Sequence, residues 1–317
     1  MLRGALSRLS PAGPKARLSI MIFHRVLAAP DPLCPGEVDA QRFDRICHWV
    51  RRWFNVLPLD EAEGRRRQGT LPERAMSLTF DDGYADNHDL ALPILQRHGL
   101  SATFFVAAGF LDGGCMWNDI VIEAVRRTAR PTLDLEGVAD LPLGRHTVVS
   151  LVDKRSTIDN LIRNLKYQPQ SHRKRAVDEI ARCAGVEAPA DLMMSRAQLR
   201  ALRDAGMTIG AHTVSHPILA RLEPAAAADE IGRGKRMLET LLDEPVTLFA
   251  YPNGKPGEDF ADEHVAMARE AGFDAAVTTA WGAGCAATDP YRLPRFTPWD
   301  TVRLRFGLRL MGNLKRQ

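Results

Sequence analysis

Two adjacent carboxylates stand where an apolar stretch of the chain ends. Asp81 and Asp82 follow residues 77–80, a run of strand-forming residues, and precede a glycine. In parallel α/β proteins, ligands and catalytic groups collect at the edge where the strands end. Two neighbouring carboxylates repel each other unless positive charge lies beside them. A bound metal ion supplies such charge, so this pair indicates a metal site.

Nitrogen ligands for a metal lie far downstream, at His212 and His216. Their four-residue spacing places both side chains on the same side of one helical turn. Two imidazoles and one carboxylate, which we assign to Asp82, form a three-ligand site that leaves positions open for water and substrate. Asp81 then remains free to act as a base. A metal lowers the pKa of a bound water and polarises an acyl oxygen, which suits hydrolysis of an amide or an ester.

The elements that must position these groups alternate between strands and helices. Short apolar runs predict strands, at residues 18–23, 55–59, 76–80, 102–107, 207–211, 246–251 and 275–279. Helical spacing of apolar residues and helix start and stop signals predict helices at residues 41–54, 87–98, 195–206, 224–242 and 260–271. Residues 60–68 are expected to form a short charged helix. This order predicts an α/β fold, a distorted TIM-like (β/α) barrel, whose closure residues 291–296 complete.

The stretch from about residue 111 to residue 190 interrupts this alternation. We expect three helices in it, at residues 117–128, 154–166 and 172–183. A polar segment at residues 134–149 is suited to a hairpin. We interpret it as a mainly helical insertion on the barrel rim, within a single domain of residues 1–317. Such insertions often shape substrate access, and a purely structural role fits the sequence equally well.

The composition is ordinary for a globular protein, with 45% hydrophobic and 26% charged residues. The net charge of +3 is too small to indicate a nucleic-acid partner. The five cysteines form no CxxC pair, so neither a zinc knuckle nor a disulfide framework is indicated. No signal-peptide pattern and no run of about 18 apolar residues is present, so we expect a cytoplasmic protein.

The C-terminal tail, residues 299–317, is basic and amphipathic. A terminal helix docked on the barrel explains such a pattern. A peripheral contact with the inner face of an anionic membrane is the alternative.

The two metal-ligand motifs together resemble those of a known family. Thr-Phe-Asp-Asp-Gly at residues 79–83 is similar to the first motif of the polysaccharide deacetylases, the NodB-homology family of carbohydrate esterases. His-Thr-Val-Ser-His-Pro at residues 212–217 is similar to the second motif, and the resemblance extends over residues 18–296. The family implies a distorted (β/α) barrel and metal-dependent removal of acetyl groups from N-acetylated sugars. Zinc is the metal expected first, with cobalt, nickel or iron as alternatives.

The resemblance also implies roles for individual residues. Asp81 corresponds to the general base, and Asp82, His212 and His216 correspond to the metal ligands. The remaining machinery departs from the common pattern at two places.

The third family motif lacks its usual arginine, because Ala250 stands at that position. The arginine that orients Asp81 must then come from elsewhere, and Arg295 is the candidate, with a surface ion pair as the alternative. A backbone N–H near Asn253 remains able to stabilise an oxyanion, since a backbone donor does not depend on the side chain.

The late Leu-x-His motif, which supplies the general acid, is absent. Phe-His-Arg-Val at residues 23–26 resembles an early segment of the biofilm poly-N-acetylglucosamine deacetylases, in which an N-terminal histidine is the acid. The resemblance therefore assigns protonation of the leaving amine to His24. Tyr84 and Trp281 are candidates to line the sugar pocket, although packing in the core explains both residues as well.

These features together favour a metal-dependent deacetylase that acts on an N-acetylated amino sugar of a polysaccharide or of its lipid-linked or nucleotide-linked precursor. Two alternatives stay open. One is an amidase or O-acetyl esterase with another substrate, and the other is an inactive relative that only binds carbohydrate.

Overall fold

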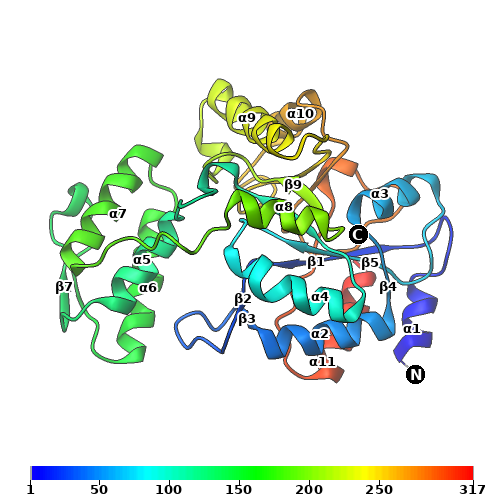
Figure 1. The fold of residues 1–317 in the computed structure, drawn as a ribbon, viewed down its shortest axis with the longest axis horizontal. Coiled ribbons are helices and arrows are strands. Elements are labelled where there is room, and N and C mark those ends of the chain that lie inside the picture. Colours follow the sequence, from blue (N-terminus) through cyan, green and yellow to red (C-terminus); the bar gives the residue numbers. More distant parts are fainter. Residues whose placement is uncertain (1, 317) are drawn as a thin grey trace. The chain divides into compact units, whose positions relative to one another are not determined.

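The computed structural model describes residues 2–316, and its centre is a parallel sheet (Figure 1). The strands lie in the order β1 (Leu18–Phe23), β5 (Ala75–Phe80), β6 (Thr103–Val106), β9 (Thr208–Ala211), β10 (Leu248–Ala250) and β11 (Ala275–Val277), with β4 (Asn55–Val56) paired to β5. Every residue of β1 and β5 is buried. Strands buried on both faces read as continuous apolar runs, which is why the sequence pattern locates them. The predicted α/β fold is confirmed.

An irregular segment links the two edges of this sheet. Leu293 bridges to Val277 of β11, and Phe296 bridges to Met21 of β1. The Phe296 N–H donates to the Ile20 carbonyl at 2.7 Å, which extends the hydrogen-bonding ladder beyond β1. The prediction that residues 291–296 contribute to closure is confirmed, although they form single bridges and not a regular strand.

Helices cover both sides of the sheet (Figure 1). They are α2 (Ala40–Trp53), α3 (Leu59–Gln68), α4 (Leu92–His98), α8 (Arg196–Asp204), α9 (Pro224–Leu242) and α10 (Asp262–Glu270). A π-helical turn, η1 (Asn87–Ala91), precedes α4, and short helical turns occur at η2 (Ala108–Phe110), η4 (Leu219–Arg221) and η5 (Pro290–Arg292). The strands β2 (Val26–Leu27) and β3 (Val38–Asp39) form a separate parallel pair. The start of α8 is a capping box, in which Ser195 and Gln198 bond each other's backbone N–H.

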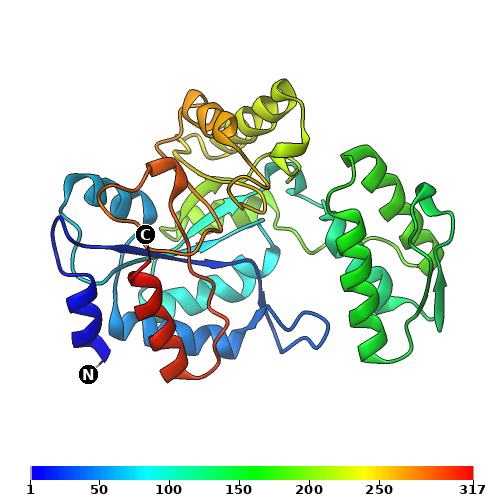
Figure 2. The same ribbon diagram turned by 180° about the vertical axis from the view of Figure 1, so that it is seen from behind.

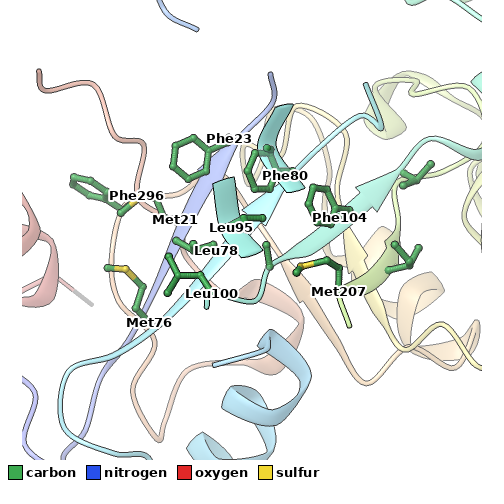
Figure 3. Close-up of a cluster of buried hydrophobic side chains, with 14 of the residues drawn as sticks. Met21, Phe23, Met76, Leu78, Phe80, Leu95, Leu100, Phe104, Met207 and Phe296 are labelled. Atoms are coloured by element: carbon green, nitrogen blue, oxygen red, sulfur yellow. The ribbon is translucent and has the colours of Figure 1, made fainter. Parts of the chain in front are cut away.

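The core between α2, α4 and the sheet is built on stacked aromatic rings (Figure 3). Phe80 of β5 lies between Phe23 of β1 and Phe104 of β6, with ring centroids 5.2 and 4.8 Å apart respectively. Phe43 of α2 meets the edge of the pair formed by Phe23 and Phe80. Because Phe80 directly precedes Asp81, this stack fixes the end of β5 from which both aspartates project.

Both ends of the chain form helices that pack on each other, α1 (Leu2–Leu9) and α11 (Arg303–Leu314). The sequence pattern did not indicate α1, whose Leu6 is fully buried. A helix of eight residues with one buried side chain, followed by Pro11, carries too little periodicity to be recognised. The docked alternative for the tail is confirmed, since Phe306, Leu310 and Leu314 of α11 are buried.

Residues 31–35 and 112–193 form a second compact unit. It contains α5 (Trp117–Arg127), α6 (Leu151–Leu165), α7 (Gln170–Ala184), the turn η3 (Val138–Asp140), and the antiparallel pair β7 (Thr132–Asp134) and β8 (Arg145–Thr147). The predicted helices and hairpin are therefore confirmed. The unit has its own hydrophobic cluster, drawn from all three helices and the hairpin region.

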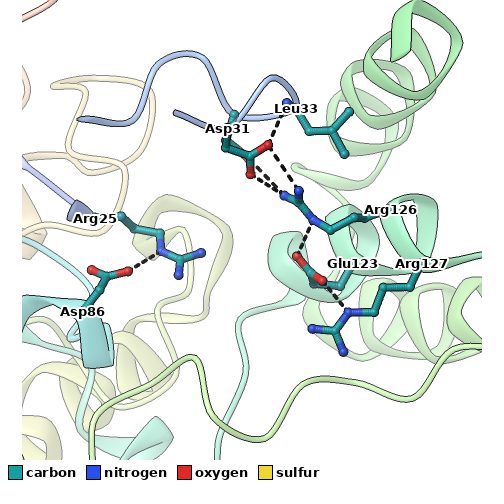
Figure 4. A network of polar contacts seen from close by, with 8 residues as sticks. Arg25, Asp31, Leu33, Asp86, Glu123, Arg126 and Arg127 are labelled. Carbon is teal, nitrogen blue, oxygen red and sulfur yellow. Dashed lines mark hydrogen bonds and ion pairs between the residues drawn. The ribbon is translucent and has the colours of Figure 1, made fainter. Parts of the chain in front are cut away.

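An ion-pair network ties residues 31–35 to α5 (Figure 4). Arg126 contacts both Asp31 and Glu123, and Glu123 also accepts a hydrogen bond from Arg127 at 2.6 Å. The side chain of Asp31 in turn accepts from the N–H of Leu33. Nothing in the sequence pattern indicated that this loop belongs to the second unit.

Within residues 2–316, no helix combines the length and the apolar character needed to cross a membrane.

Candidate metal centre and catalytic site

Asp82, His212 and His216 come together at the carboxyl edge of the parallel sheet. Asp82 follows β5 and His212 follows β9, two strands that flank β6. Asp82 Oδ1 lies 3.4 Å from His212 Nε2 and 3.4 Å from His216 Nε2. The three ligand atoms lie within 4.8 Å of one another.

A buried oxygen in this cluster supports a metal site. Among the residues that the structure describes, Asp82 Oδ1 is buried without a hydrogen-bond partner, although it faces both imidazoles. A buried carboxylate oxygen without a partner is costly unless a ligand satisfies it. An Asp-His-His donor set at this spacing suits a divalent ion such as zinc. The residues therefore fit the divalent metal site that the sequence predicted.

The protonation states of the cluster also suit metal binding. Burial alone raises the pKa of Asp82, but the facing imidazoles of His216 and His212 outweigh it, so the pKa lies below its usual range. Burial lowers the pKa of His216 to about 4, and the carboxylate of Asp82 offsets only part of this effect. At neutral pH the site therefore offers an ionised carboxylate and a neutral His216, the forms that bind a metal.

The backbone of β10 orients the first imidazole. His212 Nδ1 donates a hydrogen bond of 2.7 Å to the carbonyl of Ala250. This bond leaves the lone pair of Nε2 directed toward Asp82 and His216. Ala250, which replaces the usual arginine of the third motif, thus contributes to the site through its backbone.

A loop, and not a helical turn, brings the two histidines together. Residues 212–217 follow β9 in irregular conformation, and Thr213 and His216 have φ angles of 66° and 53°. The expectation that the two imidazoles share one side of a helical turn is therefore wrong. The rings still meet, with centroids 4.7 Å apart. The N–H of His216 donates to Thr213 Oγ1 at 3.1 Å, which closes the loop on itself.

Glu230 of α9 holds this loop from the outside. Its carboxylate accepts hydrogen bonds from the backbone N–H groups of Val214 and Ser215 at 2.9 and 2.8 Å, and from the Ser215 hydroxyl at 2.7 Å. Gly234, one turn further along α9, allows the close approach, because a Cβ there would lie 2.7 Å from the backbone carbon of Thr213. The sequence did not indicate Glu230, since no local pattern distinguishes it from the other acidic residues of α9.

The structure pairs Asp81 with Arg295. Two parallel hydrogen bonds of 2.7 Å join the guanidinium group to both carboxylate oxygens. Arg295 also donates to the Thr278 carbonyl at 2.8 Å and to Thr79 Oγ1 at 3.2 Å. Both partners are almost fully buried, at 1% exposure for Arg295 and 3% for Asp81, so the alternative of a surface ion pair is excluded.

This pairing determines the charge on Asp81. Burial raises the pKa of the Asp81 carboxyl, but the charge and hydrogen bonds of Arg295 more than compensate, and the pKa falls below its usual range. Asp81 is therefore ionised at neutral pH and its orientation is fixed by a planar, two-point contact.

His24 directly follows β1, which pairs with β5, the strand that directly precedes Asp81. The Asp81 N–H donates to the carbonyl of Phe23 at 2.9 Å, and Asn87 Nδ2 donates to the carbonyl of His24 at 2.8 Å. Burial lowers the pKa of His24, but the carboxylates of Asp82, Glu37 and Asp81 together raise it above its usual value. A cavity of about 190 Å³ adjoins this residue.

The residues next to His24 are held by a second polar cluster (Figure 4). Arg25 Nε pairs with Asp86 Oδ2 at 2.8 Å, and the other oxygen of Asp86 accepts from the N–H of Val26 at 3.1 Å. The Arg25 backbone N–H donates to Glu37. These contacts fix the backbone on the C-terminal side of His24.

The other predicted site residues lie as follows. Asn253 sits in a turn after β10 with a φ of 60°, at the same carboxyl edge of the sheet. Tyr84 is 3% exposed and packs beneath the guanidinium of Arg25, so its ring offers little surface to a sugar. Trp281 contacts the rings of both Phe296 and Trp299, which are tilted by 35° and 32° from its own ring. Trp299 was not predicted, yet it is 57% exposed and lines the cavity beside His24.

A parallel α/β sheet that carries a buried Asp-His-His cluster and an ionised carboxylate beside it is typical of metal-dependent hydrolases. The family model for polysaccharide deacetylase matches residues 68–276, and the chain belongs to that family.

Known relatives are distant in sequence. The Bacillus subtilis (strain 168) protein YxkH is 20% identical over 282 residues, which are 88% of this chain and 71% of that protein. The fold is similar to the Streptococcus pyogenes deacetylase PplD in complex with acetate, with a TM-score of 0.62 and 18% identity over 94% of this chain and 98% of that one. It is also similar to IcaB from Ammonifex degensii, with a TM-score of 0.60, 18% identity and the same coverage. At these identities, the structural likeness shows the fold alone.

Proposed function

We propose that this protein is a metal-dependent deacetylase that hydrolyses the acetamide of an N-acetylated amino sugar, in a polysaccharide or in its lipid-linked or nucleotide-linked precursor. Membership of the polysaccharide deacetylase family supports the substrate class. The observation that carries the proposal is the cluster of Asp82, His212 and His216 next to the buried pair of Asp81 and Arg295.

Asp82 Oδ1 and Nε2 of both histidines would hold the metal. When bound, a divalent ion lowers the pKa of water and polarises the acetyl oxygen. The protein residues bind and orient the substrate and the water, and they transfer the protons.

Asp81 is the general base. Its two oxygens each accept one hydrogen bond from Arg295, and a carboxylate has about four lone-pair positions, so acceptor capacity remains for the attacking water. Because Arg295 keeps the carboxyl ionised in a buried place, Asp81 can accept the proton at neutral pH. The water oxygen then bonds to the acetyl carbon and produces a tetrahedral intermediate. The backbone N–H near Asn253 is the proposed donor to its oxyanion.

His24 is the general acid. Collapse of the tetrahedral intermediate breaks the bond between carbon and nitrogen, and the leaving nitrogen takes a proton from the imidazolium of His24. The raised pKa of His24 increases its protonated fraction near neutral pH. The products are acetate and a free amine. The exposed ring of Trp299 in the adjoining cavity is suited to contact with a sugar face.

Release of acetate from N-acetylglucosamine oligomers by the purified protein tests this proposal. We expect release to disappear on chelation, to return with added zinc or cobalt, and to collapse in Asp81→Asn and His24→Ala. The matched controls are Asp89→Asn and His88→Ala, which change an ion pair outside the site.

Two results would redirect the proposal. Stoichiometric metal binding without acetate release, but with turnover of aryl acetates or cyclic amides, would indicate an esterase or amidase. Metal binding with no turnover of any acyl substrate would indicate a relative that only binds carbohydrate.

A further inference from the structure

The C-terminal helix α11 has a second apolar side that the fold does not use. Its buried side packs through Phe306, Leu310 and Leu314. On the opposite side, Leu304 and Leu308 remain 67% and 52% exposed. Large aliphatic side chains exposed on successive turns of one helix indicate a surface that contacts another molecule.

The exposed side is amphipathic. With 3.6 residues per turn, Leu304, Leu308 and Met311 form one row along the helix, in which Met311 is partly buried against the core. Lys315 continues this row, and Arg305 lies beside it. We call these five residues (Leu304, Arg305, Leu308, Met311 and Lys315) the outer face of α11. It consists of an aliphatic row with basic residues at its side and its end.

Helices α1 and α11 pack against each other (Figure 2). Neither of them contains an aspartate or a glutamate. Gly307 permits this packing, since a Cβ at that position would collide with the side chain of Leu2. Asp300, just before α11, pairs with Arg309 at 2.8 Å and so does not neutralise Arg305 or Lys315.

We propose that the outer face of α11 binds the surface of an anionic lipid bilayer. Helices with an aliphatic row and adjacent basic residues lie in the headgroup region, where shallow insertion and attraction to acidic lipids act together. The charge also argues against a second copy of the chain as the occupant. A two-fold dimer places the same patch on both partners, so its basic residues would face each other.

Co-sedimentation of the full chain with vesicles tests the proposal, with vesicles of phosphatidylcholine alone and of phosphatidylcholine mixed with phosphatidylglycerol. We expect binding to the mixed vesicles only, and a decrease as salt is added. Leu304→Ser/Leu308→Ser and Arg305→Gln/Lys315→Gln should each reduce partitioning about tenfold or more. Acetate release from soluble oligomers should not change in either variant, because these residues lie outside the catalytic site.

A matched control removes exposed aliphatic surface elsewhere. Val149 and Val152 in the second unit are 68% and 75% exposed, and Val149→Ser/Val152→Ser should leave vesicle binding unchanged. Three results would overturn the proposal. They are no binding to the mixed vesicles at low salt, an equal loss of binding in the valine control, or a concentration-dependent dimer that disappears in the leucine variant.

Discussion

Replacement of Arg295 by methionine tests how the carboxylate of Asp81 is kept ionised. Arg295 makes two charge-assisted hydrogen bonds to Asp81 and two more to Thr79 and Thr278, all in a buried place. Hydrogen bonds to charged groups each contribute about 1.5–3 kcal/mol. Removing one partner of a buried ion pair leaves the other charge buried and unpaired. We therefore expect Arg295→Met to lower the free energy of unfolding by about 3–5 kcal/mol.

Urea unfolding of the metal-free protein at neutral pH measures this loss. Arg65→Met is the control, because Arg65 forms a pair with Glu61 at 2.7 Å but is 46% exposed, and exposed pairs contribute about 0–1 kcal/mol. Asp81→Asn/Arg295→Met should recover part of the loss, since it removes the stranded charge as well. A loss in Arg295→Met no larger than in Arg65→Met would refute the reasoning.

The same ion pair predicts that the contribution of Asp81 to stability depends on pH in opposite directions in the natural chain and in Arg295→Met. In the natural chain the pKa of Asp81 lies below its unfolded value, so its contribution to stability is present above that value and is lost as the pH falls through the folded pKa. Without Arg295, burial raises the pKa of Asp81, and its contribution to stability is lost as the pH rises through the folded pKa. Arg295→Met should therefore become more stable, relative to the natural chain, as the pH decreases from neutral toward about 4. A parallel decline in both proteins would contradict this account.

Two further substitutions separate metal binding from proton transfer. Glu230→Gln should weaken metal binding about 10–100-fold, because an amide nitrogen cannot accept from the Ser215 hydroxyl and the uncharged amide oxygen accepts more weakly from the N–H groups of Val214 and Ser215. Competition with a chelator measures this change, and Asp229→Asn, on the exposed side of the same helix, should leave the affinity unaltered. His24→Ala should lower kcat about 10²–10⁴-fold with unchanged metal affinity, and a weakened affinity instead would show that His24 acts on the metal site.

Much of the fold was predictable because its signals are local. Buried parallel strands are continuous apolar runs, which is why β1 was located to the residue. Helix α9 was also located to the residue, since Pro224 suits a helix start and its apolar positions recur at helical spacing. The candidate metal ligands were predictable for the same reason, because Asp82 follows such a strand after one intervening residue and His212 directly follows another.

The amino-acid sequence by itself determined the strands, most of the helices and the residue types that reach the carboxyl edge of the sheet. Only the tertiary structure decided how these residues are held. Asp81 and Arg295 are 214 residues apart, and no local pattern specifies their contact. Glu230 reaches the histidine loop because α9 packs against that loop, and Leu293 and Phe296 link the sheet edges through single bridges that leave no periodic pattern. Local propensity acts over a few residues, whereas these contacts depend on how the whole chain closes around the sheet.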